Sequence, residues 1–415
     1  MDIRAVSGYA LSSPIDPPQD RRFAGGTRRL NKRDVVLVVV ETGDGARGFS
    51  TAGASSSAMR EYFEGDSQGT FADVVDGAVA GALEGETLEA IEDAAAILSR
   101  TDLPTHLRTE AISAIDVALY DLRGKELGAP IYDLLADEYG TDPTTEMPLY
   151  ASAGMYMEPE GYVRQAEVLE REGFFGYKYR PGIGPAGDRE TVDHLVDAVD
   201  EMEIMLDVHT WWKADDSYDA AVVRDLVEHA SAAGAYWIEE PVEPADREGY
   251  ADLAETGAAL AGGESEPSPE SLRELGETGS VDFLQGDVRH HEGYTGCRPA
   301  IEYCRGRDVE FVPHNFGTWL GLIANAHLVA AAPDVRLLEY PVFTDDPLIE
   351  AEPDPGMYPF DLAFDILEGA PAVEDGTLTA PDGPGLGIEV TLDVLETYPF
   401  VDGPWTEFRY DDDRR

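Results

Sequence analysis

The sequence predicts an α/β protein in which a parallel β/α barrel follows an α+β domain. From residue 146 to about 350, apolar runs of four to eight residues alternate with helical patterns, as expected for successive strands and helices of such a barrel. Residues 1–145 instead place strand patterns before helical ones, which is typical of an α+β unit. The length of 415 residues fits a barrel of roughly 200 to 250 residues plus a second unit.

The first region, residues 1–145, is expected to begin with a strand pair. The stretch RDVVLVVVETGDGARGFST predicts two strands joined by the turn GDG, and DPPQDRRFAGGTRRLNKRD before it is interpreted as a loop. Helical patterns follow in FADVVDGAVAGALEG, LEAIEDAAAILSR and HLRTEAISAIDVALYDLRGKELG. Gly128, just before Pro130, is expected to end the last of these helices.

The barrel region, residues 146–350, contains seven apolar runs that end in a residue able to do chemistry. They are GFFGYKYR, EIMLDVH, AYWIEEP, ALAGGES, VDFLQGDV, VEFVPHNF and VRLLEYP, after a first strand near YASAG. In a parallel β/α barrel the carboxyl ends of the strands carry the active site. We therefore expect nine side chains to converge at one mouth: Lys178, Arg180, Asp207, His209, Glu239, Glu264, Asp287, His314 and Glu339. Residues 351–415, rich in Pro, Gly and Asp, are expected to pack back on the first domain.

Composition and charge exclude several classes of protein. Hydrophobic residues make up 43%, enough for a core, and no apolar stretch approaches the ~20 residues of a membrane span. The N-terminus lacks the basic and apolar regions of a signal peptide, so a cytoplasmic protein is expected. The formal net charge of −53 would repel nucleic acid and anionic membranes.

Lysine is almost absent from this acidic chain. Only Lys32, Lys125, Lys178 and Lys213 occur, and acidic excess with few lysines resembles proteins of haloarchaea, which stay soluble in molar salt. Because lysine is so rare here, Lys178 at the end of a barrel strand is expected to have a functional role. The alternative is that its side chain snorkels from a strand edge.

Three carboxylates are predicted to bind a divalent cation. Asp207, Glu239 and Glu264 end three successive strands, and carboxylate and water oxygens are the ligands that Mg²⁺ prefers, with Mn²⁺ possible. No His or Cys accompanies them in zinc spacing. The alternative is that each carboxylate is a solvated charge at a strand end.

Histidines near these strand ends predict acid–base chemistry. Asp287 could accept a hydrogen bond from one nitrogen of His314 and raise the basicity of the other. His209 lies two residues after Asp207 and should point to the same side of the strand. Glu339, protonated or through a neighbour, could donate a hydrogen bond to developing negative charge.

Over about 350 residues the chain resembles the mandelate racemase/muconate lactonizing enzyme branch of the enolase superfamily. The resemblance rests on EAISAIDVALYDLRGKELGAPIYDLL, GYKYR, LDVH, WIEEP, GGE, GDV, PHNF and LLEYP, in this order. It implies an α+β domain that caps a modified TIM barrel, (β/α)7β, with Mg²⁺ bound to the substrate carboxylate. It also implies a base that removes the proton α to that carboxylate.

The resemblance also implies roles for individual residues. Asp207, Glu239 and Glu264 would bind the metal, Asp287 and His314 would form the base dyad, and Glu339 would be the electrophilic acid. Family racemases commonly carry Lys-x-Lys on the second strand, where this chain has Lys178 and Arg180. Because arginine is a poor base, this departure favours one-base chemistry.

The pair Asp207-x-His209 resembles that of sugar-acid dehydratases, in which the extra imidazole can protonate a departing 3-hydroxyl. We therefore expect a Mg²⁺-dependent dehydratase of an aldonate or aldarate, in which His314 takes the C2 proton and a 2-keto-3-deoxy acid forms. Lys178 and Arg180 are expected to hold the substrate carboxylate or a hydroxyl. The alternative is a racemase or epimerase of a 2-hydroxy or sugar acid, and a non-catalytic relative is disfavoured because every metal and dyad position is filled. The resemblance also implies a homo-oligomer.

Loops of the capping domain are expected to set specificity. The basic cluster of the presumed loop comprises Arg21, Arg22, Arg28, Arg29, Lys32 and Arg33, and FSTAGASSSAMREYF adds hydroxyl and aromatic groups. The cluster could attract an anionic substrate to the mouth, or it could pair with acidic neighbours at a subunit contact. Trp211 could line the sugar pocket or pack under the loop.

Overall fold

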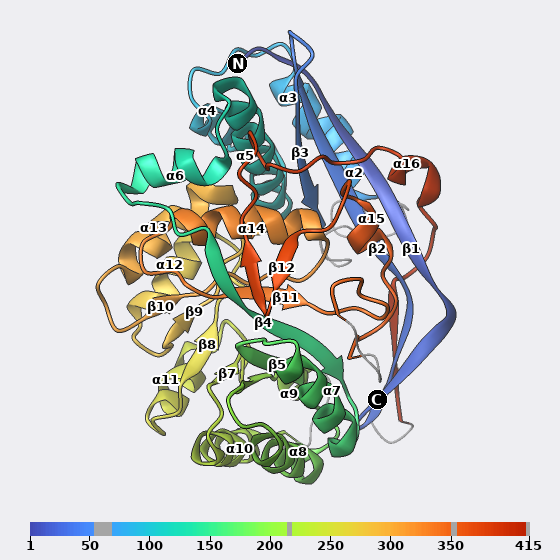
Figure 1. Cartoon of the computed structure of the whole chain (residues 1–415), viewed down its shortest axis with the longest axis vertical. Coiled ribbons are helices and arrows are strands. Elements are labelled where there is room, and N and C mark those ends of the chain that lie inside the picture. The colour runs from blue at the N-terminus through green and yellow to red at the C-terminus, as the bar shows by residue number, and fades with distance from the viewer. Residues whose placement is uncertain (54–68, 214–217, 350–354, 412–415) are drawn as a thin grey trace.

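The computed structural model describes residues 1–53, 69–213, 218–349 and 355–411, which form a sheet domain and a barrel (Figure 1). Residues 54–63 of the stretch FSTAGASSSAMREYF therefore lie outside the described residues. Within the described ranges, no helix is both long enough and apolar enough to cross a membrane.

The first domain is built on an antiparallel sheet covered by helices. Its strands are β1 (Ile3–Phe23), β2 (Gly26–Thr42) and β3 (Arg47–Ala52). A continuous helical run follows as α2 (Phe71–Val74), the π-helix η1 (Val75–Val79) and α3 (Ala80–Leu83), and then come α4 (Glu92–Leu98), α5 (Thr105–Leu127) and α6 (Ile131–Tyr139). As predicted, α5 ends at Gly128, whose φ of 68° is left-handed.

The stretch DPPQDRRFAGGTRRLNKRD is not a loop, so that prediction is wrong. It forms the tip of the long β1–β2 hairpin, in which Phe23 pairs with Gly26 and Gln19 with Leu30. Phe23 and Leu30 are fully buried, so the tip is held by packing as well as by backbone hydrogen bonds. The ladder is irregular between Pro14 and Gln19, where prolines cannot donate to it.

The second region is the predicted (β/α)7β barrel. Strands β4 to β10 pair in parallel in sequence order, and β11 pairs in parallel with β4. The strands are β4 (Glu146–Met155), β5 (Gly176–Arg180), β6 (Glu203–Asp207), β7 (Trp237–Glu239), β8 (Leu260–Gly262), β9 (Phe283–Leu284), β10 (Glu310–Phe311) and β11 (Leu338–Pro341). The helices are α7 (Pro159–Arg171), α8 (Pro185–Ala198), α9 (Thr210–Lys213), α10 (Ala220–Ala233), α11 (Arg247–Ala254), α12 (Pro269–Glu277), α13 (Gly293–Cys304) and α14 (Trp319–Ala331).

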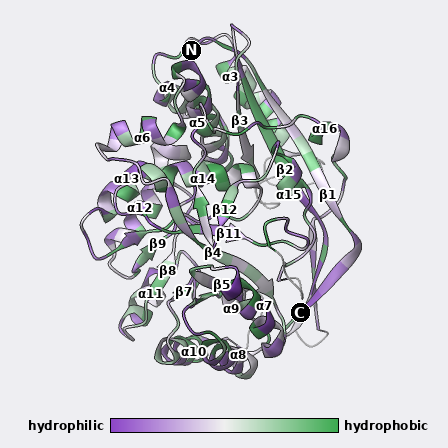
Figure 2. Cartoon of the chain, in the orientation of Figure 1, coloured by the Kyte–Doolittle hydropathy of each residue, from purple (hydrophilic) through white to green (hydrophobic). Residues whose placement is uncertain are grey.

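Burial follows this architecture. Every residue of α14 is buried, and most of them are hydrophobic, whereas α8 and α10 bury only part of their residues. In Figure 2, α8 and α10 accordingly contain many purple, hydrophilic residues. The inward apolar residues of the strands, such as Met205, Trp237 and Val312, form a separate small cluster inside the barrel. The carboxyl ends of the strands, beyond this apolar cluster, carry the polar residues of the mouth.

The C-terminal segment touches both domains. Its elements are α15 (Leu362–Asp365), β12 (Ala372–Glu374), β13 (Thr377–Thr379), α16 (Val394–Thr397) and β14 (Thr406–Tyr410). β13 pairs with the start of β4, whereas β14 pairs antiparallel with β2. In Figure 1 the blue β1–β2 hairpin consequently runs beside red C-terminal elements.

Helix α5 fixes the first domain against the barrel. Ser113 accepts a hydrogen bond from the backbone N–H of Glu292 at 2.8 Å, and Asp116 accepts one from the N–H of Tyr294 at 2.7 Å. Asp116 thereby satisfies a free N–H at the start of α13. Ser113 and Asp116 are three positions apart, so they lie on one face of α5.

Candidate active site

A cavity of about 750 Å³ lies between the strand ends of the barrel, the first domain and the C-terminal segment. From the barrel it is lined by Glu264, Ser265, His290 and His314, from the first domain by Arg33 and Glu110, and from the C-terminal segment by Trp405, among others. Two of the nine predicted mouth residues, Glu264 and His314, therefore face this cavity directly.

His314 and Asp287 are brought together, as the sequence predicts. The distance from His314 Nδ1 to Asp287 Oδ2 is 3.0 Å. Asp287 is held in turn by Arg289, whose Nη2 lies 2.5 Å from Oδ2, and by Asn325, which donates to Oδ1 at 3.1 Å. Burial raises the cost of charging Asp287, but Arg289 and the hydrogen bond from His314 hold its pKa well below the usual value.

The carboxylate of Glu264 lies between two imidazoles. Its Oε2 is 2.9 Å from His314 Nε2, and its Oε1 is 4.0 Å from His209 Nδ1. Burial alone would lower the pKa of His314, yet the charge of Glu264 and the hydrogen bond to Asp287 raise it well above the usual value. His209 Nδ1 also lies 2.6 Å from Asp207 Oδ1, as expected if both side chains leave the strand on the same side.

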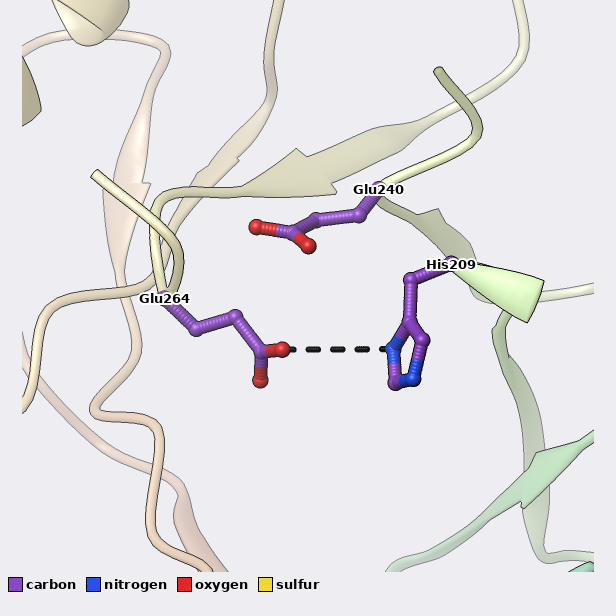
Figure 3. A group of neighbouring side chains, drawn as sticks. All are labelled: His209, Glu240 and Glu264. Atoms are coloured by element: carbon purple, nitrogen blue, oxygen red, sulfur yellow. Dashed lines mark ion pairs between the residues drawn. The ribbon is translucent and has the colours of Figure 1, made fainter. Parts of the chain in front are cut away.

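A group able to hold a cation is present at this point. Ligand atoms of His209, Glu240 and Glu264 all lie within 4.8 Å of one another. Figure 3 shows the carboxylate of Glu264 facing the imidazole of His209, with the carboxylate of Glu240 beside them. Two carboxylates and one imidazole around a common point suit a divalent cation, and Asp207 adds a further oxygen next to His209.

This group overlaps with the predicted ligand set but does not equal it. Glu239 and Asp207 are direct partners on neighbouring parallel strands, so their side chains leave the sheet on the same side. Glu240 would alternate to the other side, but its φ of 46° turns the chain at the strand end, and its carboxylate accepts hydrogen bonds from Ser265. The doubled glutamate of WIEEP is the sequence signal for this second candidate, although the predicted ligand set contains only Glu239.

Lys178 and Arg180 contact carboxylates of the site. Lys178 Nζ lies 2.9 Å from both carboxylate oxygens of Glu239 and 2.8 Å from Glu339 Oε1. Arg180 Nε donates to Asp207 Oδ2 at 3.1 Å. Burial opposes the charge of Lys178, but the two glutamates raise its pKa well above the usual value. Both cations therefore neutralise buried acids.

Glu339 is surrounded by donors. Its Oε2 accepts a hydrogen bond from the backbone N–H of Asn315 at 2.8 Å, and the hydroxyl of Tyr150 lies 3.4 Å from the same oxygen. With Lys178 on the other oxygen, Glu339 is tied to β4, to β5 and to the loop that follows β10.

His290, which is not among the predicted site residues, also lines the cavity. Its Nδ1 lies 2.9 Å from Glu110 Oε1, and its Nε2 lies 4.0 Å from Asp287 Oδ2. Burial opposes its protonation, but Glu110 raises the pKa of His290 above the usual value. The contact to Glu110 spans 180 positions, so no local pattern could have predicted it.

The other predicted substrate-binding residues lie apart from the cavity lining. Arg21 donates to the backbone carbonyl of Met357 at 2.7 Å, and Arg22 pairs with Asp411. Arg28 is buried, with its guanidinium 5.0 Å from the ring of Trp405. Trp211 is also buried, and its Nε1 donates to Asp188 at 2.9 Å while its ring stacks on Tyr218. Of the basic cluster, only Arg33 is among the described residues that line the cavity.

Comparisons with known proteins agree on one family. A model described as "Enolase C-terminal domain-like" matches residues 161–394, and one described as "Mandelate racemase / muconate lactonizing enzyme, N-terminal domain" matches residues 16–136. The D-galactarolactone cycloisomerase of Agrobacterium fabrum is 28% identical, and the match covers 97% of this chain and all of that protein. The D-gluconate dehydratase of Thermoproteus tenax is 28% identical over 69% of this chain and 56% of its own length.

A solved structure supports the same fold. A racemase from Streptomyces coelicolor with bound magnesium has a TM-score of 0.74 and 22% identity, covering 95% of this chain and 99% of that one.

Proposed function

Because the chain belongs to the mandelate racemase/muconate lactonizing enzyme family of the enolase superfamily, we propose that it is a sugar-acid dehydratase that depends on Mg²⁺. It would remove the proton on C2, next to the carboxylate, and expel the hydroxyl on C3. The observation that carries this proposal is that two imidazoles, those of His314 and His209, flank one carboxylate, Glu264. One imidazole can serve as base and the other as acid.

The metal would be held by Asp207, Glu239 and Glu264, with Glu240 as the competing ligand. Bound there, a divalent cation neutralises the charge that develops on the substrate carboxylate as its α-proton leaves. A donor set of three carboxylates fits Mg²⁺, with Mn²⁺ as the other candidate. The magnesium in the Streptomyces coelicolor racemase supports this choice.

His314 is the proposed base. Asp287 fixes the ring through Nδ1, which leaves Nε2 to accept the C2 proton. Nε2 lies 2.9 Å from Glu264, and it would become available to the substrate when Glu264 binds the cation. Arg289 and Asn325 hold Asp287 in place, which keeps the imidazole from rotating.

His209 is the proposed leaving-group acid. It donates a proton to the C3 oxygen, the C3–O bond breaks, and water departs with the bonding electrons. The enol left behind takes up a proton at C3 and becomes a 2-keto-3-deoxy acid. Lys178, beside Glu239 and Glu339, supplies a fixed positive charge at the same mouth.

A cycloisomerase is the second candidate, because the match to D-galactarolactone cycloisomerase covers the whole chain. In such a reaction the leaving oxygen on the β-carbon belongs to a ring, so the product is an isomer and no water is released. Racemisation or epimerisation remains the third candidate. Racemisation is less well supported because it needs a second base, which family racemases carry on the second strand. In this chain that strand offers Lys178 and Arg180, and both are bound to carboxylates.

The test is a screen of five- and six-carbon aldonic and aldaric acids and their lactones with Mg²⁺ in molar KCl. Formation of 2-keto-3-deoxy acid from one stereochemical series is the expected result. His209→Asn should retain exchange of the C2 proton with deuterated solvent but lose roughly 10²- to 10⁴-fold in dehydration, whereas His314→Asn should lose both.

Exchange at C2 without a keto acid, in the wild type, would refute dehydration and favour an epimerase. A keto acid formed only from lactones would favour the cycloisomerase.

A further inference from the structure

Among the described residues, Arg33 faces the cavity without an acidic partner. It lies on β2 and lines the cavity, and no carboxylate of the described residues lies within ion-pair distance of its guanidinium. Its Nε is buried and makes no hydrogen bond within the described part of the chain. By contrast, Arg22, Arg29 and Lys32 of the same hairpin pair with Asp411, Asp20 and Asp34.

Aromatic rings fix the position of this guanidinium. Its central carbon lies 4.8 Å from the ring centre of Trp405, 5.6 Å from that of Tyr358, and 5.7 Å from those of Phe316 and Phe360. Cation–π contacts hold a guanidinium without consuming its N–H donors. The fork of donors therefore stays available for a ligand with planar acceptors.

The acids that line the cavity are mostly neutralised by other groups. Glu264 pairs with His314 and Glu110 with His290, at 2.9 Å in both cases.

The other described acids that line the cavity are also paired or exposed to solvent. Glu266 pairs with Arg247 at 2.7 Å and Asp34 with Lys32 at 3.0 Å, while Asp402 is exposed to solvent. None of the acids that line the described part of the cavity thus balances the charge of Arg33, which suits it to an anionic group that enters the cavity.

We propose that Arg33 binds the distal carboxylate of the substrate, which makes the substrate an aldarate, a sugar acid with a carboxylate at both ends. The inference rests on the proposed function, because the other carboxylate lies at the cation site near Glu264. Two parallel N–H···O bonds from Arg33 would select a carboxylate over the primary alcohol that ends an aldonate. Trp405 places the C-terminal segment in this subsite.

The experiment compares aldarates with aldonates of the same stereochemistry, such as galactarate with galactonate and glucarate with gluconate. Variants Arg33→Met and Arg33→Lys are measured beside the wild type. Arg29→Met is the matched control, since Arg29 lies on the same strand, pairs with Asp20 and is not among the cavity-lining residues.

The wild type should prefer the aldarate, and Arg33→Met should lower kcat/KM for the aldarate by roughly 10- to 100-fold, mainly through KM. The kcat/KM for the aldonate should change much less, so the variant should lose the preference for the aldarate. Arg33→Lys should retain part of the preference because it keeps the charge but loses the fork. Arg29→Met should match the wild type.

Equal use of aldonates and aldarates by the wild type, or an equal loss of both in the Arg33 variants, overturns the subsite and leaves the proposed function standing. If thermal unfolding shows that Arg33→Met does not fold, Arg33→Lys decides by the same comparison. If no acid is turned over or exchanged, the proposed function fails. In that case, calorimetry measures the binding of aldarate and of aldonate to the wild type and to Arg33→Lys, and this tests the subsite independently of activity. Equal affinities of the wild type for the two acids would overturn the subsite.

Discussion

Glu239 and Glu240 are adjacent in sequence but differ in their surroundings. Lys178 and Gln285 hold the carboxylate of Glu239, the latter at 2.7 Å, whereas Ser265 holds that of Glu240. Glu239 leaves its strand on the same side as Asp207, and Glu240 lies within the group that includes His209 and Glu264. The two residues therefore define alternative cation sites that a measurement can separate.

We predict that Glu239→Gln weakens Mg²⁺ binding by about 10- to 100-fold and that Glu240→Gln weakens it less. The physical reason is that replacing a charged oxygen ligand removes a large attraction to a divalent ion. Glu239 leaves its strand on the same side as Asp207, whereas Glu240 lies just past the end of β7. Isothermal titration calorimetry with Mg²⁺ measures both variants. The reverse order would assign the cation to His209, Glu240 and Glu264.

At the residue scale, the sequence predicted the contacts that depend on strand ends and missed those that cross domains. Asp287 and His314 meet because neighbouring parallel strands end at the same edge. The contact of His290 with Glu110 depends on how α5 lies on the barrel, which no local pattern encodes. Arg33 was placed in the basic cluster, but its separation from Arg21, Arg22 and Arg28 follows from the hairpin register.

Among the elements, α5 carries a titratable contact at the domain boundary. Burial raises the pKa of Asp116 to about 7, although Thr295 and Tyr294 donate hydrogen bonds to it. Some carboxyl groups have a higher pKa in the folded chain than in the unfolded chain. Such a group contributes its full stabilisation of the fold at pH values below its pKa in the unfolded chain. This stabilisation is lost as the pH rises through the pKa of the group in the folded chain.

We predict that Asp116→Asn gains stability relative to the wild type as the pH rises from about 4 to 8. The neutral amide cannot ionise, whereas Asp116 loses its proton near pH 7, so the relative gain is at most about 4 kcal/mol. Urea unfolding of both proteins at several pH values measures the difference. A difference that does not vary with pH would contradict the prediction.

The element the sequence failed to predict is β1, together with the tip of β2. Pro14, Pro17 and Pro18 interrupt the apolar alternation, so the stretch reads as a loop. The hairpin tolerates them because the pairing is irregular between Pro14 and Gln19 and resumes beyond it. Among the barrel strands only β4 contains an internal proline, Pro148 near its start, so the carboxyl ends of the strands could be predicted.

The whole molecule carries a formal charge of −53, and mutual repulsion of its acids opposes folding at low salt. We predict that raising KCl from about 0.1 M to 2 M increases Tm by on the order of 10 °C, because the screening length falls from ~10 Å to below ~3 Å. Differential scanning calorimetry across this range is the measurement, with sucrose as an uncharged control. A Tm that is constant or falls with KCl would refute adaptation to molar salt.

The pairing of β14 with β2 has a consequence for the order in which the protein is made. The hydrogen bond from Arg28 to Thr406 joins residues 378 positions apart, and Trp405 is the ring nearest to the guanidinium of Arg33. Domains fold as they leave the ribosome, at roughly 5–20 residues per second, so the barrel can form before Trp405 has been synthesised. The pocket around Arg33 would then be the last part of the molecule to mature, and a nascent chain could hold a finished barrel while still unable to recognise its substrate.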